Sequence, residues 1–307
     1  MNKMCRLYQM KVPVVKEVPV PDLSHPNPKY EMLPKHEFTM GFVAPKGQGK
    51  TTTIINLMEF YKGMFHNIIV FSPTVSSDEK WDYIKKIPLL VENIPLKDWI
   101  RKQSQGDKEN PVVEKLPVKE EFEGLVADRD PEFDGKIPES CFFEDYDEEV
   151  LKDIYQQQMK IVKLLKKHGK TKHLANRILL IFDDLVGSTL FNNARQNVFK
   201  GFNTRHRHYS CSMLMVSQGY REIPKTVRTN FTCLILFEIC SEAELEVIAE
   251  EYPMGIRKAF NKSAKDLWHD MYLYAIKDPF SFLYYNMQEP DKSKRCMKKF
   301  EEYLYFE

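Results

Sequence analysis

A segment near the start of the chain has the composition of a loop that binds the phosphate groups of a nucleotide. The segment consists of Ala44, Pro45, Lys46, Gly47, Gln48, Gly49, Lys50, Thr51 and Thr52. Oligophosphate needs several backbone N–H groups that converge on it, and Gly47 and Gly49 permit this close approach of the backbone. Lys50 would bring a mobile cation to the β- and γ-phosphates, and the Thr51 hydroxyl would complete the ligands of Mg²⁺. The segment therefore predicts binding of a nucleoside triphosphate together with Mg²⁺.

The neighbouring sequence distinguishes this segment from a glycine-rich surface turn. Residues 37–43 have the pattern of a strand and residues 50–61 that of a helix, so the loop occupies a strand-to-helix turn. The amino end of such a helix adds the positive end of its dipole to the phosphate site. Ala44 stands where the motif G-x-x-x-x-G-K-[ST] has its first glycine, and alanine is small enough to be tolerated there.

Two adjacent aspartates follow a run of five apolar residues, 178–182. A phosphate-loop enzyme needs one carboxylate at the end of a buried strand to hold Mg²⁺ through water, and a second group to order the attacking water. We assign Asp183 to the metal and Asp184 to the activation of water. An aspartate is also common as a helix N-cap after a strand, but this alternative explains one aspartate well and two poorly.

A polar amide, Gln218, comes shortly after a further expected strand at residues 212–216. At this end of a sheet, an amide can contact both the γ-phosphate and the attacking water. The alternative is an ordinary turn at the end of a strand.

Arginines lie on both sides of the same strand. Arg205 and Arg207 precede it, and Arg221 and Arg228 follow it. An arginine that reaches the γ-phosphate of a neighbouring subunit neutralises developing charge and accelerates hydrolysis by several orders of magnitude. All four are candidates for this role, and the two that follow the strand could also contact DNA. Surface arginines are common, so each of the four taken singly could be a surface residue without a catalytic role.

Alternating strands and helices are expected to position these residues. Further strands are expected at Asn67–Phe71 and 233–237, and further helices at 147–168, at 194–202 and from a capping box of Ser241 and Glu244 to about Glu251. Residues 272–276 and 281–285 have the pattern of a β-hairpin. Strands that alternate with helices form a mostly parallel sheet covered by helices. The expected fold class is α/β: a P-loop NTPase (RecA/ASCE-like) three-layer α/β/α domain with a mostly parallel central sheet.

Composition divides the 307 residues into three parts. These are a proline-rich arm (1–36), an ATPase domain (37–290) with an acidic, lysine-rich insertion at about 75–145, and a charged tail (291–307). The arm is expected either to be disordered or to lie on the domain or on a neighbouring subunit. The insertion is expected to hold short helices around 81–87 and 96–102, and the tail to form a surface helix.

The overall charge limits how the chain could contact nucleic acid. The formal net charge is +1, so any contact with DNA must come from local patches or from a ring of subunits that gathers charge around a channel. No apolar run approaches the length of a membrane span. Six scattered cysteines without a C-x-x-C pair give no indication of a zinc site.

Four motifs in order carry a family resemblance: A-x-x-G-x-G-K-T, N-I-I-V-F-S-P-T, L-L-I-F-D-D-L and R-H-x-H-x-x-x-S-M-L-M-V-S-Q. This series resembles the poxvirus-type DNA-packaging ATPases of the FtsK–HerA superfamily, which large DNA viruses, virophages and related mobile elements share. The resemblance covers roughly residues 37–290. It does not explain the proline-rich arm or the insertion.

The resemblance implies a motor that uses ATP and Mg²⁺ to push double-stranded DNA into a preformed capsid. It implies a homo-oligomeric ring, hexamer or pentamer, that docks on capsid or portal-vertex proteins. Such a motor would work in the host-cell cytoplasm or viral factory, or in association with the virion. The superfamily places its trans-acting arginine just before the sensor strand, which favours Arg205 or Arg207, and a glutamine at the position of Gln218. Many relatives have glutamate where this chain has Asp184, whose shorter side chain would have to lie nearer the water.

Other classes of protein share parts of this pattern. A small-molecule kinase would need an arginine-rich lid, which the acidic insertion does not resemble. A GTPase would need N-K-x-D, whereas Asn261 and Lys262 are followed by Ser263 and Ala264. A cellular or mobile-element DNA translocase or helicase has the same ATPase core. The non-enzymatic alternative is an assembly protein that nucleotide only locks together, and the complete set of Lys50, Thr51 and both aspartates argues against it.

Overall fold

The computed structural model describes residues 25–105, 118–126, 132–185, 187–191, 197–254 and 262–306. Within them one nine-stranded sheet has the order β3-β2-β4-β5-β1-β6-β7-β8-β9. The strands are β1 (Thr39–Val43), β2 (Asn67–Phe71), β3 (Phe142–Phe143), β4 (Ile178–Asp183), β5 (Cys211–Ser217), β6 (Cys233–Leu236), β7 (Leu283–Asn286), β8 (Cys296–Lys298) and β9 (Glu302–Leu304). From β3 to β6 every pairing is parallel, and β7, β8 and β9 add antiparallel pairings at one side.

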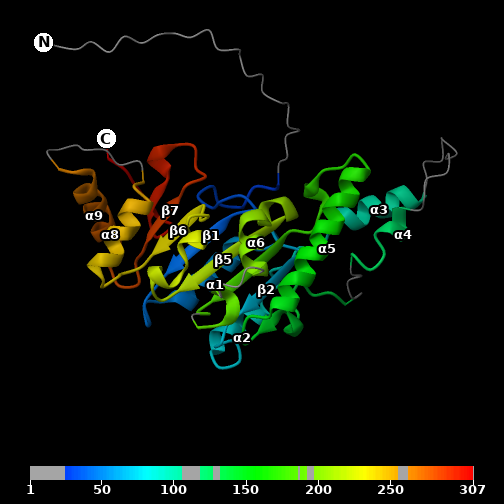
Figure 1. The fold of residues 1–307 in the computed structure, drawn as a ribbon, viewed down its shortest axis with the longest axis horizontal. Helices are drawn as coiled ribbons and strands as arrows, with labels where there is room; N and C mark the ends of the chain where they lie inside the picture. The colour runs from blue at the N-terminus through cyan, green and yellow to red at the C-terminus, as the bar shows by residue number, and fades with distance from the viewer. Residues whose placement is uncertain are drawn as a thin grey trace, which may run out of the picture.

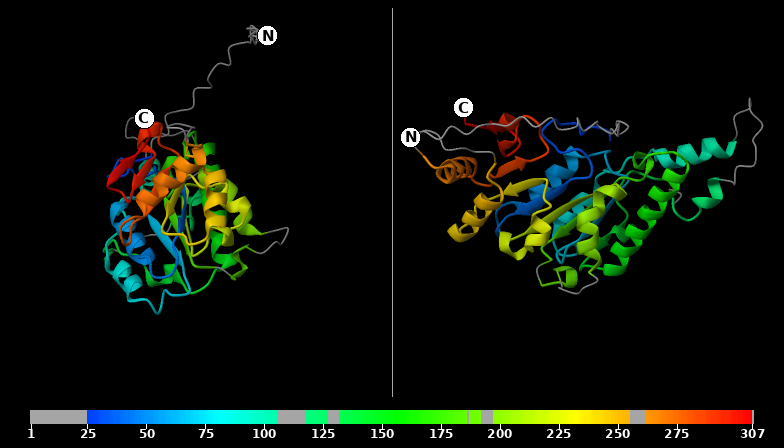
Figure 2. Two further views of the ribbon diagram at one scale, coloured as in Figure 1. Left: turned by 90° about the vertical axis from the view of Figure 1, so that its left-hand side faces the viewer. Right: turned by 45° about the horizontal axis from the view of Figure 1, so that its top comes forward.

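Helices cover both faces of this sheet (Figure 2). They are α1 (Lys50–Phe60), α2 (Glu79–Lys86), α3 (Pro95–Gln105), α4 (Val118–Glu121), α5 (Glu148–Lys167), α6 (Val198–Arg205), α7 (Lys225–Arg228), α8 (Glu242–Glu251) and α9 (Ala264–Ala275). Figure 1 shows α8 and α9 beside β7 at one side, and α3 and α4 at the other. The expected fold class, a three-layer α/β/α domain with a mostly parallel sheet, is confirmed.

Burial of both faces explains the continuous apolar strands. All six residues of β4 are buried. Alternate side chains point to opposite faces of a strand, so Leu180 and Phe182 enter the core beneath α5, α6, α8 and α9, whereas Leu179 and Ile181 enter the core beneath α1 and α2. Two cores thus fix the strand from both sides, and this holds the residues that follow it in place.

Several helix boundaries follow from local signals. Asp147 caps α5, where its side chain accepts hydrogen bonds from the N–H groups of Glu149 and Val150. Ser241 caps α8 as expected, accepting from Glu244 N. The short helices expected around residues 81–87 and 96–102 are α2 and α3.

Two expectations near the carboxyl terminus are wrong. Residues 272–276 are not a hairpin strand, because Tyr272 lies in α9, which a capping box of Ser263 and Asp266 begins. Trp268, Met271, Tyr272 and Ala275 are buried along one side of this helix. The strand that follows, β7, instead pairs antiparallel with β6.

The charged tail is also not a surface helix. It contains β8 and β9, which pair with each other, and β8 pairs with β7. Cys296 and Met297 are buried in β8, and the turn between the strands has Lys299 at φ 53°. Burial of these two residues against the sheet outweighs the surrounding charges, and local sequence gives no sign of that long-range pairing.

The described part of the proline-rich arm, residues 25–36, lies on the domain. Leu33 is buried in a core, Tyr61 donates a hydrogen bond to Pro34 O at 2.9 Å, and Tyr284 donates one to Met32 O at 2.8 Å. Of the two alternatives for the arm, this part takes the ordered one. Residues 1–24 lie outside the described residues.

Candidate active site

The expected site residues come from three loops at the carboxyl ends of neighbouring strands. The phosphate loop follows β1, Asp183 ends β4, and Gln218 follows β5. Because β5 lies between β1 and β4, the three loops meet, and Ala44 N donates a hydrogen bond to Ser217 O at 3.0 Å. A cavity of about 890 Å³ opens there, which is large enough for a nucleotide.

The residues that line the cavity come from two parts of the chain. Most belong to the phosphate loop, to its helix and to the polar groups facing them: Pro45, Lys46, Gly47, Gly49, Lys50, Thr51, Thr52, Thr53, Asn56, Thr74, Asp78, Lys80, Asp183, Asp184 and Gln218. The remainder come from the carboxyl-terminal part of the chain: Phe280, Phe282, Lys299 and Glu301. Ala44 and Gln48 are the two members of the predicted loop that do not line it.

The loop backbone has the conformation that its glycines allow. Gly47 has φ 85° and Gly49 has φ 89°, values at which an L side chain is strained. Gly49 is the N-cap residue of α1 and makes no side-chain hydrogen bond, which leaves backbone N–H groups of the first turn available to a ligand. Ala44 is fully buried and its methyl group belongs to an apolar core, which accounts for alanine in place of the first glycine.

Lys50 lies between the two aspartates. Its Nζ is 3.7 Å from Asp183 Oδ1 and 3.4 Å from Asp184 Oδ2. Gln218 Nε2 donates a hydrogen bond to the same Asp184 oxygen at 2.5 Å. The structure therefore brings together the cation, the two carboxylates and the amide that the sequence placed on separate segments.

Asp183 has the environment of a metal ligand. The residue is 2% exposed, and Ser72 donates a hydrogen bond to its Oδ2 at 2.8 Å, but Oδ1 is buried without a hydrogen-bond partner among the described residues. Burial raises the pKa of Asp183, and the nearby Lys50 ammonium offsets part of that rise. A buried carboxylate oxygen without a donor is costly unless a cation completes it, so the residues fit a hard cation such as Mg²⁺.

Asp184 differs from Asp183 in exposure and in backbone conformation. It is partly exposed to the cavity and has φ 54°, which is uncommon for a residue other than glycine. Its N–H donates to Val216 O at 3.0 Å, which fixes the backbone beside β5. Such outliers occur where the surrounding structure holds a functional group in place.

Two polar residues of the site were missed at the sequence level. Ser72 is the first residue after β2, as Asp184 is after β4, and the N-I-I-V-F-S-P-T motif contains it. Asp78 caps α2 and accepts a hydrogen bond from Thr51 Oγ1 at 3.5 Å. The signal for Ser72 was its position after an apolar strand, whereas nothing in the sequence linked Asp78 to Thr51.

Arg205 and Arg207 do not line this cavity. Arg205 ends α6 and Arg207 lies in the turn before β5, so both are at the amino ends of the strands, away from Gln218. Both side chains are exposed, and Arg205 Nη1 donates to Tyr155 Oη at 3.4 Å. Within one subunit these arginines are therefore placed away from the phosphate loop.

The other two arginine candidates have structural contacts. Arg228 is buried and donates two hydrogen bonds to the Glu251 carboxylate, at 2.8 and 2.9 Å, with its guanidinium 4.7 Å from the Tyr220 ring centroid. The guanidinium group is thus hydrogen-bonded within the domain and is not available for bidentate binding of a phosphate. Arg221 is exposed and donates to Ala243 O at 2.9 Å.

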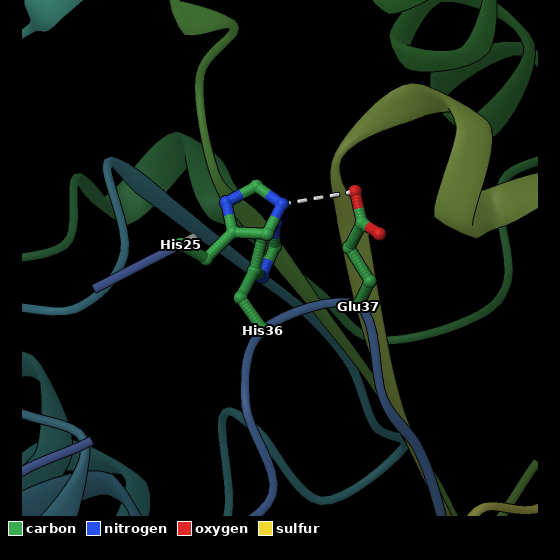
Figure 3. A group of neighbouring side chains, drawn as sticks. All are labelled: His25, His36 and Glu37. Atoms are coloured by element: carbon green, nitrogen blue, oxygen red, sulfur yellow. Dashed lines mark hydrogen bonds and ion pairs between the residues drawn. The ribbon is translucent and has the colours of Figure 1, made fainter. Parts of the chain in front are cut away.

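A second group of polar side chains lies where β1 begins. His25, His36 and Glu37 offer ligand atoms within 4.8 Å of one another, which makes them a candidate metal centre (Figure 3). His25 Nε2 and Glu37 Oε1 are 3.1 Å apart. Lys172 Nζ donates to both Glu37 oxygens, at 2.6 and 2.5 Å, so an ammonium group already neutralises the carboxylate.

Both ring nitrogens of His36 are also engaged. Nε2 is 3.0 Å from Ser210 Oγ, and Nδ1 is 2.8 Å from Ser212 Oγ. Burial, followed by the charges of His25, Arg177 and His66, lowers the pKa of His36 well below its usual value. The group is a hydrogen-bonded network that ties the arm to the start of β1 and β5, and within it His25 Nδ1 is buried without a hydrogen-bond partner among the described residues.

The sheet order, the glycine loop at the start of α1 and the carboxylates after β4 define a P-loop NTPase. Residues 131–269 match the family model described as Poxvirus A32 protein, which confirms the resemblance to the poxvirus-type packaging ATPases. The matched segment contains Asp183, Asp184, Arg205 and Gln218, and the phosphate loop lies before it.

Solved structures of a viral packaging NTPase and of a conjugation coupling protein are similar to this chain at low identity. The genome packaging NTPase B204 from Sulfolobus turreted icosahedral virus 2, in complex with AMP, has 11% identity and a TM-score of 0.45, with 85% of this chain and 95% of that chain covered. The pCW3 conjugation coupling protein TcpA has 12% identity and a TM-score of 0.43, with 83% and 58% covered. Similarities at this level carry no argument about function. No curated protein matches the sequence.

Proposed function

We propose that this protein is a Mg²⁺-dependent ATPase that drives double-stranded viral DNA into a capsid as a homo-oligomeric ring of five or six subunits. The observation that carries the proposal is the single cavity shared by Lys50, Asp183, Asp184 and Gln218. The family match over residues 131–269 supports a role in packaging a viral genome.

The backbone of the phosphate loop and five side chains of the cavity have a part in the proposed reaction. The loop N–H groups and Lys50 would bind the β- and γ-phosphates, and Lys50 would exchange its contacts with the aspartates for phosphate oxygens. Asp183 and Thr51 would hold Mg²⁺, which supplies neutralising charge to the phosphate oxygens. Asp184, fixed by Gln218, would orient the attacking water and accept its proton.

The arginines support a site that is completed between subunits. Arg205 and Arg207 are exposed and lie at the opposite ends of the strands from the phosphate loop. A subunit could therefore present them to a neighbour and not to its own nucleotide. A ring would also gather local positive charge around DNA, which a monomer of net charge +1 does not provide.

The same proposal includes the partners and the place of action. The ring would dock on capsid or portal-vertex proteins and act in the host-cell cytoplasm or viral factory, or in association with the virion. No helix among the described residues is long and apolar enough to cross a membrane.

Measurement of the ATPase rate with and without double-stranded DNA, beside the mass of the assembled species, tests the proposal. We expect hydrolysis that rises with protein concentration and with DNA, and a DNA effect that shrinks as salt increases. Arg205→Ala or Arg207→Ala protein should bind ATP almost normally yet hydrolyse it poorly. Mixing either one with Lys50→Ala protein should restore activity, since an intact loop then meets an intact arginine.

Arg101→Ala is the matched control, because Arg101 is an exposed arginine on α3 that is paired with Asp98. It should retain full activity. Full activity in a strictly monomeric sample would overturn the ring. A protein that binds ATP and assembles without turnover would be a nucleotide-locked assembly protein, and one that moves DNA without any capsid protein as partner would be a general translocase or helicase.

A further inference from the structure

The carboxyl-terminal part of the chain contributes an aromatic side to the nucleotide cavity. Phe280 lies in the loop between α9 and β7, lines the cavity and is 62% exposed. The ring is close to the phosphate loop, because a Cβ built on Gly49 would meet Phe280 Cδ1 at 3.3 Å. An exposed phenylalanine therefore lies directly beside Gly49, the N-cap residue of α1.

The loop that carries Phe280 is held in place. Ser281 N donates to Asp278 O at 3.1 Å, and Asp278 also forms an ion pair with Lys298 of β8. Phe282 is buried, with its ring centroid 5.0 Å from that of Phe237. Phe280 itself has φ 57°, a conformation that is unfavourable for a bulky side chain. Both the exposure and the backbone conformation of this residue are costly, and the surrounding contacts maintain them.

Two charged residues stand on the same side of the cavity. Lys299 and Glu301 come from the β8–β9 turn, and Lys299 N donates to Phe282 O at 2.9 Å. Among the ion pairs of the described residues neither side chain takes part, whereas Lys298 pairs with Asp278, and Glu302 accepts a hydrogen bond from Tyr274 Oη at 3.0 Å. Within the described part of the chain, the two residues that face the cavity thus keep a free donor and a free acceptor.

We propose that Phe280 is the stacking platform for the nucleobase, with Lys299 and Glu301 at the polar edge of the base. The inference rests on the proposed function, since it concerns the same nucleotide. A triphosphate on the loop next to Lys50 leaves the base and ribose to occupy the rest of the cavity, and Phe280 borders that space beside Gly49. An aromatic ring stacks on any base, and a carboxylate beside an ammonium can bond to the donor and acceptor groups of a purine edge.

Binding of a non-hydrolysable ATP analogue and of inorganic triphosphate, both with Mg²⁺, separates the base from the phosphates. Phe280→Ala should weaken binding of the ATP analogue about tenfold and leave binding of inorganic triphosphate unchanged. Phe280→Tyr should bind both ligands as the parent protein does. Phe280→Gly should weaken binding of the ATP analogue as much as Phe280→Ala does. Its Tm should be unchanged or higher, because glycine accepts the positive φ.

Tyr83→Ala is the control, since Tyr83 is another exposed aromatic residue, on α2, that does not line the cavity. Glu301→Gln should change the ratio of ATP to GTP affinity by about threefold or more, and Glu302→Gln should not. If Phe280→Ala weakens binding of both ligands equally, or of neither, Phe280 does not stack on the nucleobase. A parent protein that binds neither ligand would instead contradict the proposed function.

Discussion

Asp183 at the carboxyl ends of the parallel strands and His36 at their amino ends are both buried polar residues, but their hydrogen bonding differs. At the carboxyl ends, Asp183 has a buried oxygen without a hydrogen-bond partner among the described residues, and a charged lysine nearby. At the amino ends, His36 bonds through both nitrogens to serines of β5 and of the turn before it. His206 bonds in the same way, to Thr39 Oγ1 at 3.0 Å and Asn203 O at 2.9 Å.

This difference distinguishes a ligand-binding residue from one that only stabilises the fold. A buried polar group that is satisfied by its neighbours stabilises one arrangement of the chain. A buried polar group that lacks a partner reduces stability until a ligand arrives, and such groups gather where ligands bind. Residue type alone therefore does not identify the ligand site, because His36 is of a type that binds metals but has both nitrogens hydrogen-bonded, whereas Asp183 has one oxygen without a hydrogen-bond partner among the described residues.

The largest expected effect concerns the carboxyl ends. Lys50→Ala should reduce ATP hydrolysis at least about a hundredfold and weaken nucleotide binding, because the only cation beside Asp183 and Asp184 among the described ion pairs is lost. The Tm should stay within a few degrees, since Lys50 belongs to no apolar core. Steady-state ATPase rates and thermal melts check both points. Lys62→Ala, an exposed lysine after the end of α1, is the control. If the Lys50→Ala protein hydrolyses ATP at a near-native rate, the assignment of the phosphate loop is wrong.

A smaller effect, which is a gain in stability, is expected for Asp183→Asn. The raised pKa of Asp183 means that its ionised form costs folding free energy as pH rises through that pKa. The amide should therefore increase the free energy of unfolding at neutral pH by about 1 kcal/mol while Mg²⁺-dependent nucleotide binding is lost. Urea unfolding without nucleotide, with and without Mg²⁺, measures the first effect. A less stable Asp183→Asn protein would show that the buried Oδ1, which has no hydrogen-bond donor among the described residues, does not reduce stability.

The last effect concerns the amino ends of the strands and depends on pH. The pKa of His36 is lowered chiefly by burial, so folded His36 stays neutral while unfolded His36 takes up a proton near its usual pKa. The unfolded state then binds more protons, and stability should fall by about 1 kcal/mol between pH 7.5 and 5.5 from this residue. His36→Gln should lower stability at neutral pH and flatten that dependence.

His208→Gln, at an exposed histidine of the same chain, serves as the comparison and should leave the slope unchanged. Unfolding free energies at several pH values provide the measurement. An equal slope in His36→Gln and the parent protein would show that other groups, such as the buried His206, carry the acid sensitivity.

The sequence predicted the carboxyl ends of the strands better than the amino ends. A continuous apolar run followed by Asp183 reveals both a buried strand and its polar end, because a parallel strand is buried on both faces. The loop of Gly47, Gly49 and Lys50 is likewise a local pattern. Both are fixed by residues adjacent in the chain, and so a single sequence contains them.

The features that sequence missed depend on distant partners. His36 meets Ser210 across the sheet, and β8 becomes a strand only because β7 offers a pairing edge. The expectation of a strand at residues 272–276 was wrong because aromatic residues favour strands, whereas packing of Trp268 and Tyr272 makes this segment the end of α9. Phe280 had no local signal at all, since its proximity to Gly49 joins the two ends of the domain.

Strand β5 connects the two ends of the strands most directly. Its seven residues span about 23 Å, from the turn that holds Arg207 to the loop that holds Gln218. Hydrogen bonds to β1 and β4 on both sides prevent it from sliding alone. In the proposed ring, one stiff segment would therefore contact a subunit's own nucleotide at one end and the neighbour's nucleotide at the other. Hydrolysis events in adjacent subunits would then be timed relative to each other through a single strand, without any hinge between them.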